Sequence, residues 1–395
     1  MVSAQPGVSL DLEEGALRMS RIIPIGMVAL ILAACGSGSG QPGSGLTGQI
    51  EIGGPLPLTG PAAFAGTLEQ EGMQLAVDEV NTTGFLGAAK LHASYVDVGA
   101  TPQQAVTVAR QMIDQDKVAA LTGLASASQA PAVAAVAQAG KTPFIVVEGG
   151  APGVSSTGDY ITQTNLQQFT YADKMGKALK QLNVTTTEIL YAQDNGTIAT
   201  LVHTYTDQIF PKYGIKPTLK AYIGTDTDLS AGVTQGLAAK VDAIGCLFIG
   251  AQGTTCLSQA RSAGFTGQMW GQAGFDGGVA VKAGSVADKL VFTAAFSPDF
   301  PYPSSKKFVS LYTSKHPDKV PTAFQAEGYD AIWLIARAAK EGGGTTREAI
   351  HTGMLKVLAK GMDGALGPET WDKDRQLLAP GAVIQIKDGK PTLLL

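Results

Sequence analysis

Residues 49–98 read QIEIGGPLPLTGPAAFAGTLEQEGMQLAVDEVNTTGFLGAAKLHASYVDV. The short segments at 49–56 and 91–98 have the length and composition of strands that end at turn residues. Between them, apolar residues from Leu68 to Val80 recur at the spacing of one helix face. A strand, a helix and a second strand in this order predict a βαβ unit with parallel strands.

The same alternation continues along the chain. Thr101 followed by Pro102 predicts a helix start, because threonine caps a helix and proline suits its first position. Further strands are predicted at 118–124, 143–150, 188–193, 218–223, 242–250, 267–272 and 291–296. At the end of the chain, residues 365–372 and 382–390 look like the two arms of a β-hairpin. The pattern predicts an α/β fold with two doubly wound parallel-sheet domains, the second beginning near Phe169.

Composition excludes several classes of protein. Hydrophobic residues make up 45% of the 395 residues and charged residues 16%, which is unlike a disordered chain. The net charge is −4 and no cluster of lysine and arginine is present, so nucleic acid is not an expected partner. The four histidines, at positions 92, 203, 316 and 351, lack metal-ligand spacing. Without hydrolase or P-loop motifs either, we predict neither a metal, nor a cofactor, nor an enzyme.

The N-terminus has the features of an export signal. The apolar run at 22–34 is 13 residues long, too short to span a bilayer, and it follows Arg18 and Arg21. Residues 1–34 are therefore predicted to be a signal peptide. The sequence Leu-Ala-Ala before Cys35 resembles a bacterial lipobox, in which the cysteine thiol receives a diacylglycerol; an ordinary signal peptide is the alternative. Because acidic residues suit such a segment poorly, Met19 is an alternative start.

Residues 35–46 then form a lipidated cysteine and a Gly/Ser-rich tether. This composition is typical of a flexible linker. The prediction is a lipoprotein anchored in the membrane of the cell envelope, with its folded part outside the cytoplasm.

Six blocks of sequence together resemble one family. They are GGPLPLTGPAAFAGTLEQEGMQLAVDEVNTTGFLG (53–87), ATPQQAVTVARQMI (100–113), LASASQAPAVAAVAQAGKTPFI (124–145), CLSQARSAGF (256–265), AFQAEGYDAIWLIARA (323–338) and GALGPETWDKD (364–374). Their order is similar to that in the type I periplasmic solute-binding proteins of the branched-chain amino acid kind, which serve ABC importers. The resemblance extends over residues 49–395, essentially the whole mature chain.

The resemblance implies two lobes joined by a three-stranded hinge. The crossings would fall near Thr164, Ser297 and Gly367. The first lobe would then comprise residues 47–163 and 298–365, and the second residues 165–296 and 367–395. Such lobes close on a small solute, and the partners would be that solute and the permease subunits of an importer.

In the first lobe, the resemblance points to residues in three loops. Ser126 and Ser128 match the serine-rich turn that holds the ligand's carboxylate, although they could instead only cap the following helix. Ala151 matches a backbone position in the next loop. The position after it, a threonine in amino-acid binders, is Pro152, which has no N–H to donate. Phe64 stands one position before the family's tyrosine.

In the second lobe, the resemblance points to Asp194, Asn195 and Asp276. The acidic residue that receives an ammonium group in amino-acid binders falls at Ala273, and Asp276 is near enough to replace it. An amino acid, an amide and a small organic acid therefore all remain open as the solute. A ligand sensor with the same fold is the alternative function.

Cys246 and Cys256 are ten positions apart, one in a predicted strand and one at the start of the next helix. In an oxidising compartment they form either a disulfide or two buried thiols. The residues alone leave both open.

Overall fold

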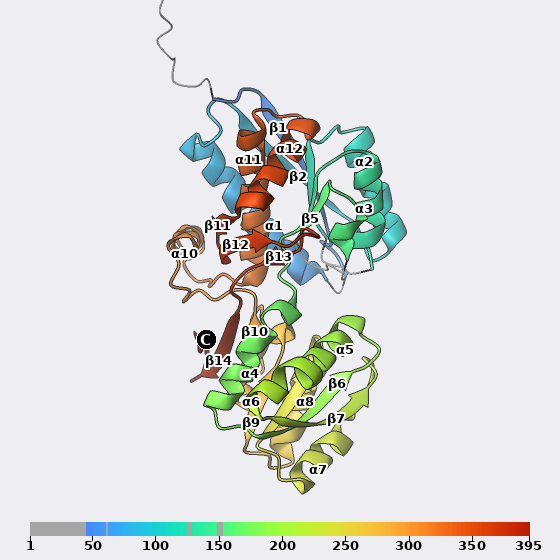
Figure 1. Cartoon of the computed structure of the whole chain (residues 1–395), viewed down its shortest axis with the longest axis vertical. Coiled ribbons are helices and arrows are strands. Elements are labelled where there is room, and N and C mark those ends of the chain that lie inside the picture. The colour runs from blue at the N-terminus through green and yellow to red at the C-terminus, as the bar shows by residue number, and fades with distance from the viewer. Residues whose placement is uncertain (1–44, 61, 125–127, 148–152) are drawn as a thin grey trace, which may run out of the picture. The chain divides into compact units, whose positions relative to one another are not determined.

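The computed structural model describes residues 45–60, 62–124, 128–147 and 153–395 (Figure 1). Its first sheet has five parallel strands in the order β2-β1-β3-β4-β5. They are β1 (Gln49–Leu56), β2 (Lys90–Asp97), β3 (Ala120–Gly123), β4 (Phe144–Val146) and β5 (Ile161–Gln163). The strand predicted at 49–56 is confirmed in full, and its neighbour lies one residue from its predicted position.

Helices cover both faces of this sheet. Figure 1 shows α2 (Pro102–Asp114) and α3 (Ala130–Ala139) on one side, and α1 (Ala63–Thr83), α11 (Ala323–Gly342) and α12 (Arg347–Lys360) on the other. Successive strand residues alternate between the two cores: Phe144 and Val146 pack with α2 and α3, and Ile145 packs with the opposite core. This period of two is what a sheet covered on both faces requires.

The predicted start of α2 is confirmed. The Thr101 hydroxyl accepts a hydrogen bond from the backbone N–H of Gln104, and the Gln104 side-chain oxygen accepts one from the backbone N–H of Thr101. Pro102 is the first helical residue. This capping box satisfies N–H groups that have no partner within the helix. The helix predicted from Leu68 to Val80 also exists, but as α1 it is longer at both ends.

The second sheet repeats this order and adds a hairpin at its edge. Its strand order is β15-β14-β10-β9-β8-β6-β7, and the strands from β10 to β7 are parallel. The strands are β6 (Thr186–Ala192), β7 (Lys216–Tyr222), β8 (Ala243–Leu247), β9 (Gln268–Gly271), β10 (Val291–Ala294), β14 (Ala382–Lys387) and β15 (Lys390–Leu393). The helices are α4 (Ala172–Gln181), α5 (Gly196–His203), α6 (Phe210–Tyr213), α7 (Ser230–Ala238), α8 (Ala251–Ser262) and α9 (Val279–Lys282). The predicted fold of two doubly wound α/β halves is confirmed.

The hairpin predicted from residues 365–372 and 382–390 is wrong. Residues 367–371 are β12, which pairs with β11 (Met362–Gly364) and β13 (Leu377–Leu378) in a separate antiparallel sheet. Residues 382–387 pair instead with β10 and with β15. Both segments alternate in the way strands do, and that alternation does not specify which strand lies next to them.

The small sheet lies against the end of β5. The indole N–H of Trp371 donates to the carbonyl of Gln163 at 3.0 Å, and the Gln376 side chain donates to the carbonyl of Asn165 at 3.0 Å. After the small sheet, the chain returns to the second sheet only at β14. The lobe boundaries stay a prediction, and these contacts favour a third crossing between Leu378 and Ala382 over one near Gly367.

Two buried acids fix the turn between β11 and β12. Asp330 of α11 accepts the backbone N–H groups of Ala365 at 2.6 Å and Leu366 at 3.0 Å. The Glu369 carboxyl group is also buried and hydrogen-bonds Asp330. Burial, together with the neighbouring charge of Asp330, raises the pKa of Glu369 well above its ordinary value. Glu369 therefore holds a proton that the unfolded chain would release.

We expect Glu369→Gln to remove a loss of stability that the wild-type protein shows as the pH rises. Folding takes up a proton at Glu369, so the free energy of unfolding falls from about pH 4 upwards through the raised pKa. Glutamine keeps an N–H donor for Asp330 and does not titrate. Urea denaturation from about pH 5 to about pH 8 measures the difference, with the exposed Glu348→Gln as the control. Equal pH slopes for wild type and Glu369→Gln would contradict this assignment.

Candidate functional site

In a parallel α/β sheet, the loops after the carboxyl ends of the strands form the ligand-binding edge. In the first sheet, Asp97 at the end of β2 organises this edge. Its carboxylate accepts the backbone N–H of Leu58 at 2.9 Å, the hydroxyl of Thr59 at 2.5 Å and the backbone N–H of Gly99 at 3.1 Å. The Thr59 hydroxyl is the main reason that the pKa of Asp97 is lowered. A charged Asp97 thus holds the loop that leads from β1 into α1.

An aromatic pair stands at the start of α1. The ring of Phe64 packs edge-on against the ring of Phe324, with centroids 5.7 Å apart and planes at 85°. Phe64 is 56% exposed, which is unusual for so large an apolar side chain. Phe324 lies in the first turn of α11 and was not among the predicted site residues. The sequence does mark the start of this helix, since Thr322 and Gln325 have the spacing of a capping box.

The serine-rich turn follows β3. Ser126 and Ala151 lie outside the described residues, whereas Ser128 is described and is exposed two residues before α3. Just before the turn, Leu124 has a φ of +73° although it is not glycine. Such a backbone costs on the order of 1–3 kcal/mol and is found most often at functional sites.

In the second sheet, a hollow of about 180 Å³ lies at the carboxyl ends of β6, β7 and β8. It is lined by Ala192, Asp194, Asn195, Gly224, Ile249 and Gln252. Asp194 accepts the backbone N–H of Gly224 at 2.8 Å, and Asn195 caps α5 by accepting the N–H of Ile198 at 3.1 Å. Both predicted residues therefore line the hollow and also hold its walls together.

Asp276 lies after β9, at the same edge of the second sheet. Its carboxylate accepts the backbone N–H of Gly277 at 2.8 Å. Burial raises the pKa of Asp276 to about 6, although hydrogen bonds from the backbone N–H groups of Gly277 and Ala323 act to lower it. Since Ala323 precedes Phe324, Asp276 and Phe64 both lie beside the first turn of α11. Asp276 is thus a carboxyl group that a nearby cation would ionise.

Ala273, at the family's acidic position, has a different role here. Its backbone N–H donates to the side chain of Gln168 at 3.0 Å, and the same side chain donates to Gln272 at 2.9 Å. Gln272 in turn donates to the carbonyl of Phe248. This chain of amides fixes the loop that carries Asp276.

Cys246 of β8 and Cys256 of α8 form a disulfide, with Cα atoms 5.9 Å apart. Both residues are fully buried. The segment between them carries Ile249 and, in the first turn of α8, Gln252, so the bond restrains one wall of the hollow. The residues alone had left the oxidation state of this pair open.

The described residues also bear on metal binding and on membrane crossing. In that part of the chain, His, Cys, Asp and Glu side chains do not gather in any group of three or more that could hold a metal ion. None of its helices combines the length and the apolar character needed to cross a membrane.

Comparison with known proteins gives matches along nearly all of the described chain. A family model described as "Periplasmic binding protein" matches residues 49–391. Leu/Ile/Val-binding protein homolog 7 of Brucella abortus is 22% identical over 363 residues, covering 86% of this chain and 88% of that protein.

Solved structures show the same similarity. A leucine binding protein from Thermotoga maritima has a TM-score of 0.77 and 25% identity, covering 88% of this chain and 98% of that one. An ABC transporter solute binding protein from R. palustris, in complex with benzoate, has a TM-score of 0.74 and 20% identity, covering 88% and 96%. The similarity therefore includes both sheets.

Proposed function

The chain belongs to the periplasmic binding protein family, and we propose that it captures a small solute between its two α/β halves and delivers it to an ABC importer. The observation that carries the proposal is the repeated strand order of the two sheets. In each half, that order places loops with polar and apolar side chains at the carboxyl edge of the sheet. Relatives of similar length include a leucine binding protein and a solute binding protein in complex with benzoate.

Capture by such a protein is a hinge motion. We place the crossings near Thr164, near Ser297 and between Leu378 and Ala382. The contacts of Trp371 and Gln376 with residues 163 and 165 support the last of these positions. The partners are the small solute and the permease subunits of the importer.

The solute proposed is a small carboxylate with an apolar body. Ser126 and Ser128, which precede α3 in the sequence, would hold its carboxylate with hydroxyl and backbone N–H groups. The edge-on pair of Phe64 and Phe324 offers an apolar wall that suits a branched alkyl group or an aromatic ring. Asp276 would receive an ammonium group where the solute has one.

We expect Ser126→Ala to weaken solute binding about 10- to 150-fold, because a hydroxyl hydrogen bond to a charged group contributes roughly 1.5–3 kcal/mol. The solute is first found by a thermal-shift screen of amino acids, amides and aromatic acids. Calorimetry then compares wild type, Ser126→Ala and the exposed control Ser285→Ala. Binding by Ser126→Ala within twofold of wild type would mean that the serine only caps α3.

Asp276→Asn should separate solutes with an ammonium group from those without. For an amino acid such as leucine, binding by the wild type should strengthen as the pH rises through about 6, because Asp276 then ionises. The asparagine variant should lose that pH dependence and bind leucine about 10- to 150-fold more weakly. Benzoate binding should change little in either respect. The exposed Asp228→Asn is the control, and equal losses for both solutes would contradict the assignment.

We also propose that Cys35 carries a lipid anchor outside the cytoplasm. The support is the short apolar run at 22–34 and the Leu-Ala-Ala-Cys sequence that ends it. Cys35→Ala should move the folded protein from the membrane fraction to the soluble fraction, because the proposed site of lipid attachment is then lost. Fractionation followed by immunoblotting measures this. Continued membrane association of the variant would show that another segment anchors the chain.

A further inference from the structure

Helices α1 and α11 touch through their backbones. A Cβ atom added at Gly72 of α1 would lie 2.0 Å from the carbonyl oxygen of Gln325, and one at Gly328 of α11 would lie 2.5 Å from that of Glu69. Only glycine allows so close an approach. Phe64 and Phe324 are in the first turns of these two helices, so the crossing places one ring beside the other.

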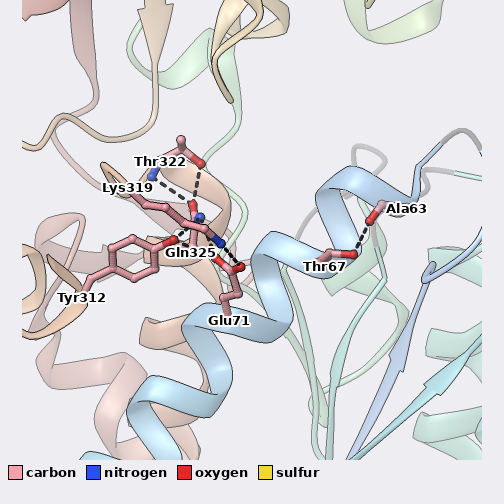
Figure 2. Close-up of polar contacts among 7 residues, drawn as sticks. All are labelled: Ala63, Thr67, Glu71, Tyr312, Lys319, Thr322 and Gln325. Atoms are coloured by element: carbon pink, nitrogen blue, oxygen red, sulfur yellow. Dashed lines mark hydrogen bonds and ion pairs between the residues drawn. The ribbon is translucent and has the colours of Figure 1, made fainter. Parts of the chain in front are cut away.

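A carboxylate two turns along α1 reaches the first turn of α11 (Figure 2). Glu71 receives the Lys319 ammonium at 2.6 Å, the Tyr312 hydroxyl at 2.7 Å and the Gln325 side-chain N–H at 3.4 Å. Burial raises the pKa of Glu71, but these three donors outweigh burial and lower it overall. Glu71 is therefore ionised at neutral pH and accepts from three separate segments.

Gln325 connects Glu71 to the backbone at the start of α11. Its side-chain oxygen accepts the backbone N–H of Thr322 at 2.9 Å and the Thr322 hydroxyl at 2.6 Å. Its side-chain N–H group donates to the Tyr312 hydroxyl at 3.0 Å. The turn fixed in this way, residues 322–325, includes Phe324.

We propose that Glu71 is a positioning residue for the solute site: its carboxylate holds the first turn of α11 and thereby sets the position of Phe324 against Phe64. The inference rests on the proposed function, because only there does Phe324 form a wall of the cleft. Glu71 itself does not touch the solute. It acts through Gln325 and Tyr312, the groups that Figure 2 joins to it.

The change Glu71→Gln would keep the shape of the side chain but replace one of its two acceptor oxygens by an NH₂ group and remove the negative charge. The new NH₂ group would face another donor, either the Lys319 ammonium or the Gln325 amide. The first turn of α11 would therefore lose a hydrogen bond that holds it in place. Asp78→Asn is a matched control. Asp78 is on the same helix, but it pairs with Lys315 at the end of α10 (Pro303–Lys315) at 2.5 Å and accepts the side-chain N–H of Gln74 at 2.8 Å.

The experiment is ¹⁹F NMR of the protein labelled with fluorophenylalanine, in which the Phe324 resonance is assigned from its loss in Phe324→Leu. The Phe324 resonance should shift or broaden in Glu71→Gln and stay in place in Asp78→Asn. If Glu71→Gln folds poorly, Lys319→Gln removes one half-exposed partner and should give a smaller shift in the same direction. An unchanged Phe324 resonance in a folded Glu71→Gln or Lys319→Gln protein would overturn the inference.

Binding of the solute found in the screen is measured on the same samples. Glu71→Gln should bind about 3- to 10-fold more weakly, comparable to the loss of one hydrogen bond, and Asp78→Asn should bind like wild type. Suppose that Glu71→Gln displaces the Phe324 resonance while Phe324→Leu binds the solute as tightly as wild type. That result would support the positioning role of Glu71 and count against the proposed cleft. Full binding by Glu71→Gln with weakened binding by Phe324→Leu would overturn the inference alone.

Discussion

The backbone contact between α1 and α11 is the constraint on which the first half of the protein depends. Gly72 and Gly328 allow the two helices to approach until carbonyl oxygens occupy the space that a Cβ atom would need. At that separation, polar side chains along the seam can meet. Glu71 meets the start of α11, and two turns later Glu79 meets the Lys307 ammonium at 2.6 Å and the Trp333 indole N–H at 3.1 Å. The crossing thus determines which charges are buried and which groups pair with them.

Helix α11 also contacts the segment just after β5 and the turn between β11 and β12. Glu327 accepts the backbone N–H of Leu166 at 3.3 Å, just after β5. One turn later, Asp330 accepts both N–H groups of the turn at residues 365–366. Buried carboxylates are costly unless they are hydrogen-bonded, and here the bonds join the helix to the segment after β5 and to the β11–β12 turn. One helix therefore links the aromatic wall, the exit from β5 and the β11–β12 turn.

Local patterns predicted the elements that depend on local physics. Residues 49–56 were predicted as a strand and the cap at Thr101 as the start of α2, and both are found, because these signals act within a few residues. Helix α1 extends beyond the predicted Leu68–Val80, because Gly66, which packs against the backbone of Pro57, and the polar residues 81–83 add nothing to its apolar pattern. The hairpin error has a related cause. Residues 367–371 and 382–387 carry strand patterns, and their partners are chosen by the rest of the fold.

The sequence by itself determined the α/β class, the doubled βαβ order and the polar residues that follow the strand ends, since all of these follow from periodicity and turn chemistry. The resemblance to the solute-binding family pointed to Asp194, Asn195 and Asp276, and all three lie at the carboxyl edge of one sheet, where parallel strands end together. Only the tertiary structure decided that Phe64 faces Phe324, that Asp276 has a raised pKa, and that Glu71 meets Lys319, 248 positions away. The physical reason is that these contacts arise where separate helices and loops pack, and their burial and distances depend on segments that no local pattern relates.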